Sequence, residues 1–316
     1  MTDHHDTAVR PSTLAWVRGH LAAGERIVRT EALHGGISAE VRRLTIATAG
    51  GGTRDLVLRT FAGRERAPEW LVREAAALTL LAGTGVPAPR LVAVDPAAAH
   101  CEHPSLLMTH LPGRTALDDE GLEARVPLLA RQLVAIHALR PAERPVAYET
   151  STTAETVVVP DGADRAAWAA AIDVIREPPP PGEGRFLHRD FQPGNVLFDA
   201  TPGGPGPVRI TGVVDWAQPS WGPADLDVAH CAANLALLHG PEWGLRFAGA
   251  YEEAGGTPAA ERSARRYWLV RDALSFSEEV EVVSEPWRQA GRTELTTRAV
   301  EGRLDAYVVA LMGAFG

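Results

Sequence analysis

The chain has 316 residues, of which 45% are hydrophobic, and a formal net charge of −9. That length suits two domains, or one domain with two lobes, and allows a sizeable core. No apolar run approaches the roughly 18 residues that a membrane-spanning helix needs, and the first residues lack the features of a secretory signal. The only cysteines, Cys101 and Cys231, argue against a disulfide framework. We therefore expect a cytoplasmic protein.

The charge is unevenly distributed along the chain. Residues 1–114 carry a balance of +2, whereas residues 115–316 carry a balance of −11. The acidic part disfavours a nucleic-acid partner. It could attract a cationic small molecule, or it could be an ordinary solvated surface. All 31 basic residues are arginines, which excludes a Walker A loop and a Schiff-base lysine.

The first third of the chain predicts a small sheet with two helices. Apolar spacing predicts helices over 12–22, with Ser12 or Thr13 as N-cap, and over 69–82. Strands are expected, in chain order, at residues 26–33, 41–47, 55–61, 91–94 and 106–109.

The pattern changes at Pro112-Gly113, after which helices dominate. Helices are expected at 121–139 and 163–175, followed by two short strands at 196–198 and 208–214 and a mostly helical remainder. The order predicts an α+β fold with two lobes, divided into residues 1–110 and 111–316. A nucleotide-sized cleft between the lobes is expected.

The strongest motif is His188-Arg189-Asp190, with Asn195 five residues after the aspartate. Asp215 follows at the end of the second short strand. The Pro/Gly-rich segment between the two strands is typical of a hairpin connection. Because the start of one hairpin strand lies beside the end of the other, Asn195 and Asp215 should be neighbours. Asp190 would lie on the loop just before them.

These residue types suit phosphoryl transfer. An amide oxygen and a carboxylate are hard ligands that can bind Mg²⁺ carrying phosphates. A further carboxylate, Asp190, can orient an acceptor hydroxyl and take its proton. Phosphoryl transfer requires mainly positioning and neutralisation of charge.

The motif and its spacing resemble the aminoglycoside phosphotransferases and their choline-kinase-like relatives, which have a protein-kinase-like fold. Protein kinases share the spacing but have Asp-Phe-Gly where this chain has Asp215-Trp216-Ala217. The resemblance implies that Asp190 is the catalytic base and that Asn195 and Asp215 bind Mg²⁺. It implies that His188 braces the catalytic loop.

The resemblance extends to residues 221–229, where Gly-x-Pro precedes an aspartate at a helix start. By spacing, Asp227 would hold the backbone of the catalytic loop. Asp225 is the competing candidate, and either residue could instead be a helix N-cap.

In the first lobe, residues 34–38 resemble the family's short glycine loop over the phosphates. Gly35 and Gly36 would let the backbone approach, and Ser38 would donate to a phosphate oxygen. Arg59 stands on the third strand where the family usually has lysine, and Glu74 fits the helix acid that pairs with it. Arginine can bind phosphate and carboxylate but is bulkier than lysine. A surface Arg–Glu pair is the alternative.

Residues 106–113 resemble the family's hinge. The backbone of Met108, Thr109 and His110 would then hydrogen-bond to the adenine edge. A core strand that ends in a turn explains the same residues.

The predicted reaction is transfer of the γ-phosphoryl group of ATP or GTP to a hydroxyl of a small molecule, with Mg²⁺. An antibiotic such as an aminoglycoside is the expected acceptor, and resistance to it the expected consequence. Four acids in residues 278–285 would suit a cation, whereas five tryptophans (Trp216, Trp221, Trp243, Trp268, Trp287) would suit a flatter acceptor such as a macrolide. The alternatives are a kinase for a choline- or homoserine-like metabolite, or an inactive nucleotide-binding protein. No membrane partner is expected.

Overall fold

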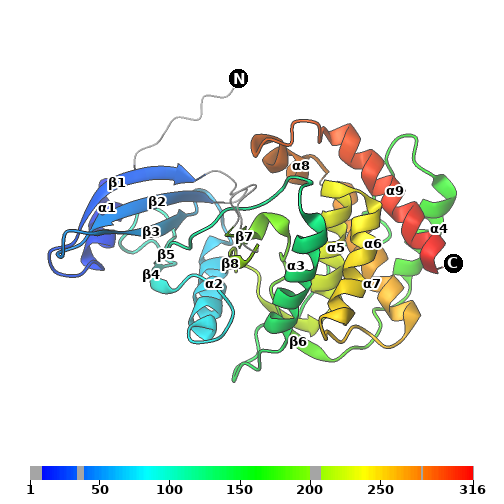
Figure 1. The fold of residues 1–316 in the computed structure, drawn as a ribbon, viewed down its shortest axis with the longest axis horizontal. Coiled ribbons are helices and arrows are strands. Elements are labelled where there is room, and N and C mark those ends of the chain that lie inside the picture. Colours follow the sequence, from blue (N-terminus) through cyan, green and yellow to red (C-terminus); the bar gives the residue numbers. More distant parts are fainter. Residues whose placement is uncertain (1–8, 34–38, 200–207, 279, 316) are drawn as a thin grey trace. The chain divides into compact units, whose positions relative to one another are not determined.

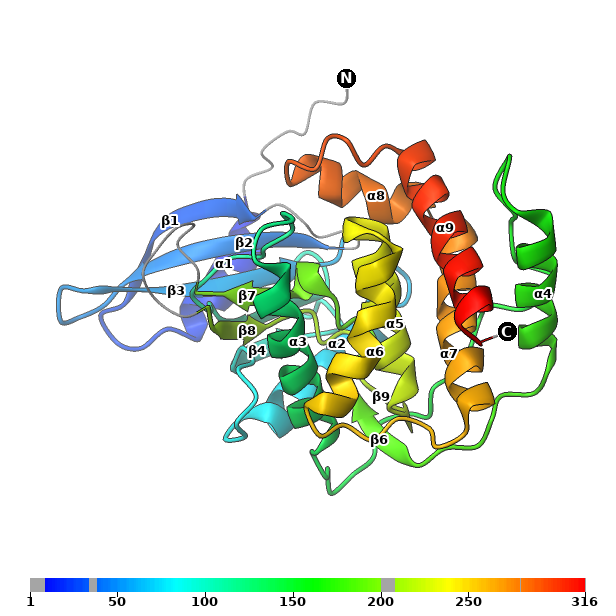
Figure 2. The ribbon, with the colours of Figure 1, turned by 45° about the vertical axis from the view of Figure 1, so that its right-hand side comes forward.

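The computed structural model describes residues 9–33, 39–199, 208–278 and 280–315. The chain divides into two compact units. Unit 1 comprises Met1–Thr84 and Ala88–Pro112, and unit 2 comprises Gly85–Pro87 and Gly113–Gly316. The main division lies close to the predicted one at residue 110. Figures 1 and 2 show the course of the chain from two directions.

Unit 1 is built on a five-stranded antiparallel sheet with strand order β1-β2-β3-β5-β4. The predicted strands and helices are all present, with ends shifted by one or two residues or, for the first helix, three. Their bounds are α1 Pro11–Gly19, β1 Arg26–Leu33, β2 Glu40–Ala47, β3 Thr53–Thr60, α2 Ala67–Leu81, β4 Leu91–Asp95 and β5 Ser105–Thr109.

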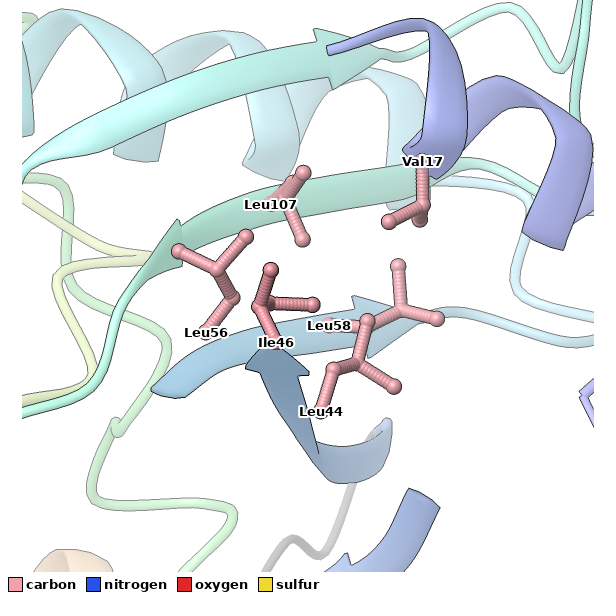
Figure 3. Packing of buried hydrophobic residues seen from close by; sticks show 6 residues of the cluster. All are labelled: Val17, Leu44, Ile46, Leu56, Leu58 and Leu107. Carbon is pink, nitrogen blue, oxygen red and sulfur yellow. The ribbon is translucent and has the colours of Figure 1, made fainter. Parts of the chain in front are cut away.

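One face of this sheet carries a hydrophobic core (Figure 3). Alternate residues of β2 point to the same face, so Leu44 and Ile46 are buried together. They pack with side chains from β3, β5 and α1, namely Leu56, Leu58, Leu107 and Val17. Each such burial contributes about 1.5–3 kcal/mol, so this cluster keeps β3 in a fixed register.

The start of α1 differs from the prediction. The N-cap is Arg10, in extended conformation, and Pro11 occupies the first turn. Proline is favoured there because its fixed φ suits a helix and it lacks an N–H that would need a partner. Thr13 is instead buried inside the helix, where its hydroxyl accepts a hydrogen bond from the Glu102 N–H at 3.4 Å.

Unit 2 is mainly helical, and α5 lies at its centre. Almost every residue of α5 from Asp225 to Leu238 is buried, because the helix packs against α6, α7 and α9. The bounds of the helices are α3 Leu122–His137, α4 Arg165–Arg176, α5 Asp225–His239, α6 Pro241–Glu253, α7 Arg262–Ser275, α8 Val280–Gln289 and α9 Thr297–Phe315. Within the described ranges, no helix is both long and apolar enough to span a membrane.

Two strand pairs accompany these helices. The hairpin prediction is confirmed, since β7 (Val196–Phe198) pairs antiparallel with β8 (Ile210–Val213). A second pair, β6 (Gly184–Leu187) with β9 (Ser220–Pro223), was not predicted. β9 contains Gly222-Pro223, which is typical of a turn, and its partner lies far away in sequence. Local pattern therefore carries no signal for this pairing.

Gly113 marks the start of the main part of unit 2. Its φ is +104°, and a Cβ atom there would lie 2.9 Å from the Phe198 carbonyl oxygen. The neighbouring Arg114 exchanges backbone hydrogen bonds with Phe198 at 3.2 and 2.8 Å. Glycine is therefore needed for the chain to pass this close to β7.

Candidate active site

The β7–β8 hairpin brings Asn195 beside the end of β8. Val196 pairs with Val213, and the Val214 N–H donates to the Asn195 carbonyl at 2.9 Å. Asp215 follows Val214 and has a φ of +62°. Aspartate tolerates this left-handed conformation better than most residues. Asn195 and Asp215 therefore lie at the adjacent ends of paired segments.

Asp190 belongs to the same cluster. The Asn195 amide nitrogen donates to the Asp190 carboxylate Oδ2 at 2.8 Å and to the Asp190 carbonyl at 2.9 Å. The other carboxylate oxygen lies 3.1 Å from His230 Nε2. About one third of the Asp190 side chain, 34%, is exposed. The three residues predicted to act together are thus within one small region of unit 2.

The donor set fits a divalent cation. Because the Asn195 amide nitrogen faces Asp190, its Oδ1 is the atom that can coordinate a metal. Amide and carboxylate oxygens are the ligands that Mg²⁺ prefers, and Mg²⁺ usually takes its other ligands from water and phosphates. In the part of the chain that is described, no group of three or more His, Cys, Asp or Glu residues is arranged to hold a metal. The residues present therefore suit a cation that arrives with a phosphate ligand.

His188 links the loop of Asp190 to the end of β8. Its Nδ1 accepts from the Asp190 N–H at 3.2 Å, and its Nε2 donates to the Val214 carbonyl at 3.0 Å. Burial lowers the pKa of His188, so the ring is neutral and the two contacts fix its tautomer. The fully buried ring of Trp216 packs against it, with centroids 4.3 Å apart. His188 is thus placed to brace the loop.

Asp227 binds the backbone of the same loop. Its carboxylate accepts from the N–H groups of His188 at 2.8 Å and Arg189 at 2.9 Å. Although burial alone would raise the pKa of Asp227, the hydrogen bond from His137 and nearby positive charges lower it to about 2. Asp225, the competing candidate, accepts instead from the Ala259 N–H with both oxygens. Of the two, the geometry favours Asp227 as the support of the loop.

One partner of Asp227, and the residue that holds this partner in turn, were missed by the sequence analysis. His137, on α3, places Nε2 3.2 Å from the Asp227 carboxylate and Nδ1 2.7 Å from the Tyr251 hydroxyl of α6. All three side chains are buried. No local signal could have found them, because they come from helices far apart in sequence.

In unit 1, Arg59 and Glu74 form the predicted pair. Arg59 Nη1 lies 2.9 and 3.1 Å from the two Glu74 carboxylate oxygens. Both side chains are buried, at 5% and 1% exposure, so the alternative of a surface pair is wrong. The guanidinium also lies over the Phe61 ring, 5.1 Å from its centroid. The pair is therefore a built part of unit 1.

The predicted hinge is part of the sheet of unit 1. Met108 pairs with Val57 of β3 and with Leu91 of β4. The Thr109 N–H donates to the Arg90 carbonyl at 2.9 Å, and the His110 N–H to the Asp55 carbonyl at 3.3 Å. Those two N–H groups are thus engaged within the unit, which limits the predicted contacts of Thr109 and His110 with adenine to their carbonyl oxygens. The predicted glycine loop, with Gly35, Gly36 and Ser38, lies outside the described residues.

Several of the acidic residues and tryptophans that were expected to bind the acceptor instead make contacts within unit 2. The Glu281 carboxylate binds Arg288 at 2.7 Å and also contacts Thr297, and Glu285 accepts from Gln289. Three of the five tryptophans are buried in the core, namely Trp216, Trp268 and Trp287. Of the four acids, Glu279 lies outside the described residues.

Comparison with known proteins defines the class. The profile of the phosphotransferase enzyme family matches residues 29–268. Because the match covers most of the chain, this protein belongs to that family. It is a small-molecule phosphotransferase with a protein-kinase-like fold. No curated protein sequence matches it significantly.

Solved structures show the same fold at low sequence identity. A candidate aminoglycoside phosphotransferase from Ralstonia eutropha JMP134 is 17% identical, with a TM-score of 0.62, over 96% of this chain and 98% of its own. Aminoglycoside phosphotransferase APH(4)-Ia is 19% identical, with a TM-score of 0.59, over 95% and 98%. Macrolide 2′-phosphotransferase from Brachybacterium faecium is 17% identical, with a TM-score of 0.55, over 93% and 97%.

Proposed function

We propose that this enzyme transfers the γ-phosphoryl group of ATP or GTP to a hydroxyl of a small molecule, with an antibiotic such as an aminoglycoside as the acceptor. The observation that carries the proposal is the cluster of Asp190, Asn195 and Asp215, held together by the β7–β8 hairpin. The loop that carries Asp190 is held by the Asp227 carboxylate, which accepts hydrogen bonds from its backbone N–H groups. Such preorganisation is what phosphoryl transfer demands of a protein.

The ligands and activities named for the structural neighbours support the proposed nucleotide and acceptor. A thermostable mutant of APH(4)-Ia was crystallised with ADP and hygromycin B, which supports a nucleotide and a small-molecule acceptor here. The neighbours include both aminoglycoside and macrolide phosphotransferases, so both acceptor classes belong in the test.

In the proposed mechanism Asp190 orients the acceptor hydroxyl. The hydroxyl proton passes to the Asp190 carboxylate while the acceptor oxygen bonds to the γ-phosphorus. The bond from phosphorus to the β–γ bridging oxygen breaks, and the nucleoside diphosphate leaves. Burial alone would raise the pKa of Asp190, but hydrogen bonds from His230 and Asn195 lower it overall. A weakly basic carboxylate suits a loose transition state, in which the proton moves late.

Other residues hold the phosphates. Mg²⁺ bound by Asn195 Oδ1 and the Asp215 carboxylate would neutralise the developing charge. We propose that Arg59 takes the part that lysine has in most relatives and contacts the α- and β-phosphates. Glu74 holds its guanidinium in place, and arginine's fork can bind phosphate through two nitrogens.

An acceptor screen tests the proposal. The purified enzyme is incubated with Mg²⁺, with ATP or GTP, and with aminoglycosides, macrolides, choline and homoserine, and nucleoside diphosphate release is measured. Acceptor-dependent release with an aminoglycoside or a macrolide is expected. Release only with choline or homoserine would contradict the antibiotic acceptor. Nucleotide binding without release on any acceptor would contradict the enzymatic proposal.

Asp190→Asn serves as the matched variant in this screen. It keeps the shape of the side chain but removes the proton acceptor, so turnover should fall by at least about a hundredfold. Nucleotide affinity, measured by calorimetry, should stay near that of the unaltered enzyme. Near-normal turnover of Asp190→Asn would show that the base is another group.

A further inference from the structure

His230 lies between two carboxylates that belong to different segments. From α5, its Nε2 is 3.1 Å from Asp190 Oδ1, and its Nδ1 is 3.4 Å from Asp272 Oδ2 on α7. The ring is stacked on Phe276, with centroids 5.6 Å apart and planes at 23°, close to parallel. A histidine between two acids has one N–H to offer to each only when both ring nitrogens are protonated.

The buried partner Asp272 requires a positive neighbour. Its side chain is 10% exposed, and among the described residues its Oδ2 atom makes no hydrogen bond. An isolated buried carboxylate is costly, and a nearby cation offsets that cost. The His230 ring nitrogen Nδ1 lies 3.4 Å from this oxygen and supplies such a cation when the ring is protonated.

The protonation of His230 follows from the same contacts. Burial alone would lower its pKa, but the charge of Asp272, the hydrogen bond to Asp190 and the charge of Asp190 raise it to about 10. The Asn234 amide nitrogen also lies 3.2 Å from Nε2 and donates to the His230 carbonyl at 3.0 Å. Nε2 cannot both accept from Asn234 and donate to Asp190. Donation to a carboxylate is charge-assisted and about twice as strong, so it prevails.

Both carboxylate oxygens of Asp190 accept a hydrogen bond. Asn195 donates to Oδ2 at 2.8 Å, and His230 lies at Oδ1. Two donors from separate elements fix the plane of the carboxylate, which one donor alone would leave free to rotate. We propose that His230, as an imidazolium anchored by Asp272 and Phe276, is a positioning residue that orients Asp190 toward the acceptor hydroxyl. This inference rests on the proposed function of Asp190.

α5 joins this contact to the support of the loop. Asp227 and His230 are three residues apart and thus share one face of the helix. Asp227 binds the backbone of the catalytic loop, and His230 binds its reactive side chain. One helix therefore sets both the position of the loop and the orientation of Asp190.

The test compares His230→Gln with His239→Gln. His239 is a matched control, because it lies on the same helix and pairs with Asp119 at 2.6 Å. The readout is acceptor-independent hydrolysis of ATP, in which water takes the place of the acceptor, together with transfer to any acceptor found in the screen. In His230→Gln, kcat should fall roughly 10- to 100-fold, the scale of a misplaced reactive group. KM for ATP should change by less than about twofold. His239→Gln should retain full activity.

A second measurement separates orientation from simple structural support. Nitrogen-15 NMR of the histidine side chains, assigned with His230→Gln, should show His230 as an imidazolium at neutral pH. It should become neutral in Asp272→Asn, and kcat should fall there as well. Added imidazole should restore part of the activity of His230→Ala.

The outcomes distinguish the two proposals. Absence of hydrolysis and transfer in the unaltered enzyme would contradict the proposed function. An active unaltered enzyme with normal kcat in His230→Gln, or a neutral His230 in its NMR spectrum, would overturn only the positioning role. A rise in KM with unchanged kcat in His230→Gln would also overturn the positioning role. It would mean that His230 stabilises the bound substrate and the transition state equally.

Discussion

At the residue scale, the proposed metal site depends on two oxygen donors from adjacent strand ends. The Val214 N–H donates to the Asn195 carbonyl, so the residue that follows, Asp215, is held near Asn195 by the backbone. An aspartate carboxylate at this position is a hard oxygen donor that can serve a cation beside the Asn195 amide oxygen. Asp225, only ten residues on, has a wholly different task, since it accepts from the Ala259 N–H.

This contrast predicts different effects of replacing the two aspartates. Asp215→Asn should weaken Mg²⁺-dependent binding of ATP at least about tenfold, because a charged ligand of the cation is lost. Asp225→Asn should bind MgATP normally. Calorimetric titration of ATP with and without Mg²⁺ measures both. Normal MgATP binding by Asp215→Asn would place the cation elsewhere.

Arg59 offers a second prediction at this scale. If it contacts the phosphates, Arg59→Ala should cost about 1.5–3 kcal/mol in the use of nucleotide, the scale of a charge-assisted hydrogen bond. That corresponds to about tenfold or more in kcat/KM for the nucleotide. Arg59→Lys should lie between Ala and the unaltered enzyme, because the shorter ammonium would be misplaced beside Glu74.

Steady-state kinetics at saturating acceptor and varied nucleotide measure the kcat/KM of the two Arg59 variants. Thermal unfolding is the control, because the buried pair also stabilises unit 1. Unchanged nucleotide kinetics in a folded Arg59→Ala variant would mean that the pair is purely structural.

At the scale of elements, α5 organises the candidate site. Its first turns carry Asp227 and His230, and the buried contact of Asp227 with His137 ties α5 to α3. Asp227 is fully buried yet ionised, since its pKa is lowered to about 2. Asp225 has the opposite behaviour, because burial raises its pKa. The pKa values of two acids on one helix are thus shifted in opposite directions.

Stability should therefore depend on pH differently in the two asparagine variants. A carboxyl with a lowered pKa stabilises the fold above the pKa of the unfolded chain, and this contribution is lost as the pH falls toward the folded value. For Asp227 the window runs from about 4 down to about 2. Asp227→Asn should lose about 2 kcal/mol of unfolding free energy at pH 7, and the difference from the unaltered protein should shrink across that window.

Asp225→Asn is the matched control. With a raised pKa, the Asp225 carboxylate contributes less when ionised, so its asparagine variant should be the less destabilised at pH 7. Urea unfolding at pH 7, 4 and 3 measures both. Equal losses in the two variants would contradict the assignment of Asp227 as the buried ionised acid.

At the scale of the whole molecule, arginine makes all the contacts that in other proteins are divided between arginine and lysine. All 31 basic residues are arginines, and several bind backbone carbonyls inside unit 2. Arg292 is an example: it is 9% exposed and contacts the carbonyls of Leu117 and Leu238 and the carboxylate of Asp119. It thereby joins the loop before α3 to the end of α5. A planar guanidinium with several N–H groups suits such bridges.

Arg292→Lys should therefore destabilise the protein by about 1–3 kcal/mol, because an ammonium cannot reach all three acceptors. Arg209→Lys is the control, since Arg209 is 72% exposed and forms a surface pair with Asp199. Its effect should stay within about 0.5 kcal/mol. Chemical denaturation measures both variants. Similar small effects at the two positions would show that Arg292 is not a structural bridge.

The sequence by itself determined the features that depend on neighbouring residues. The strands and helices of unit 1 follow from apolar periodicity, and the β7–β8 hairpin follows from two apolar segments around a turn. The hairpin alone brings Asn195 beside Asp215, so the centre of the candidate site could be predicted. The pairing of Arg59 with Glu74 came from the family resemblance, which supplies a contact that no local pattern contains.

Only the tertiary structure decided the contacts between distant segments. The β6–β9 pair, His137 beside Asp227, and Asp272 beside His230 join residues that no short pattern relates. The structure also showed that the N–H groups of Thr109 and His110 are already engaged, and that Trp216, Trp268 and Trp287 are buried. The physical reason is the same in each case. A residue type specifies what a side chain can bind, but its partner is decided by which elements the packing of the core brings together.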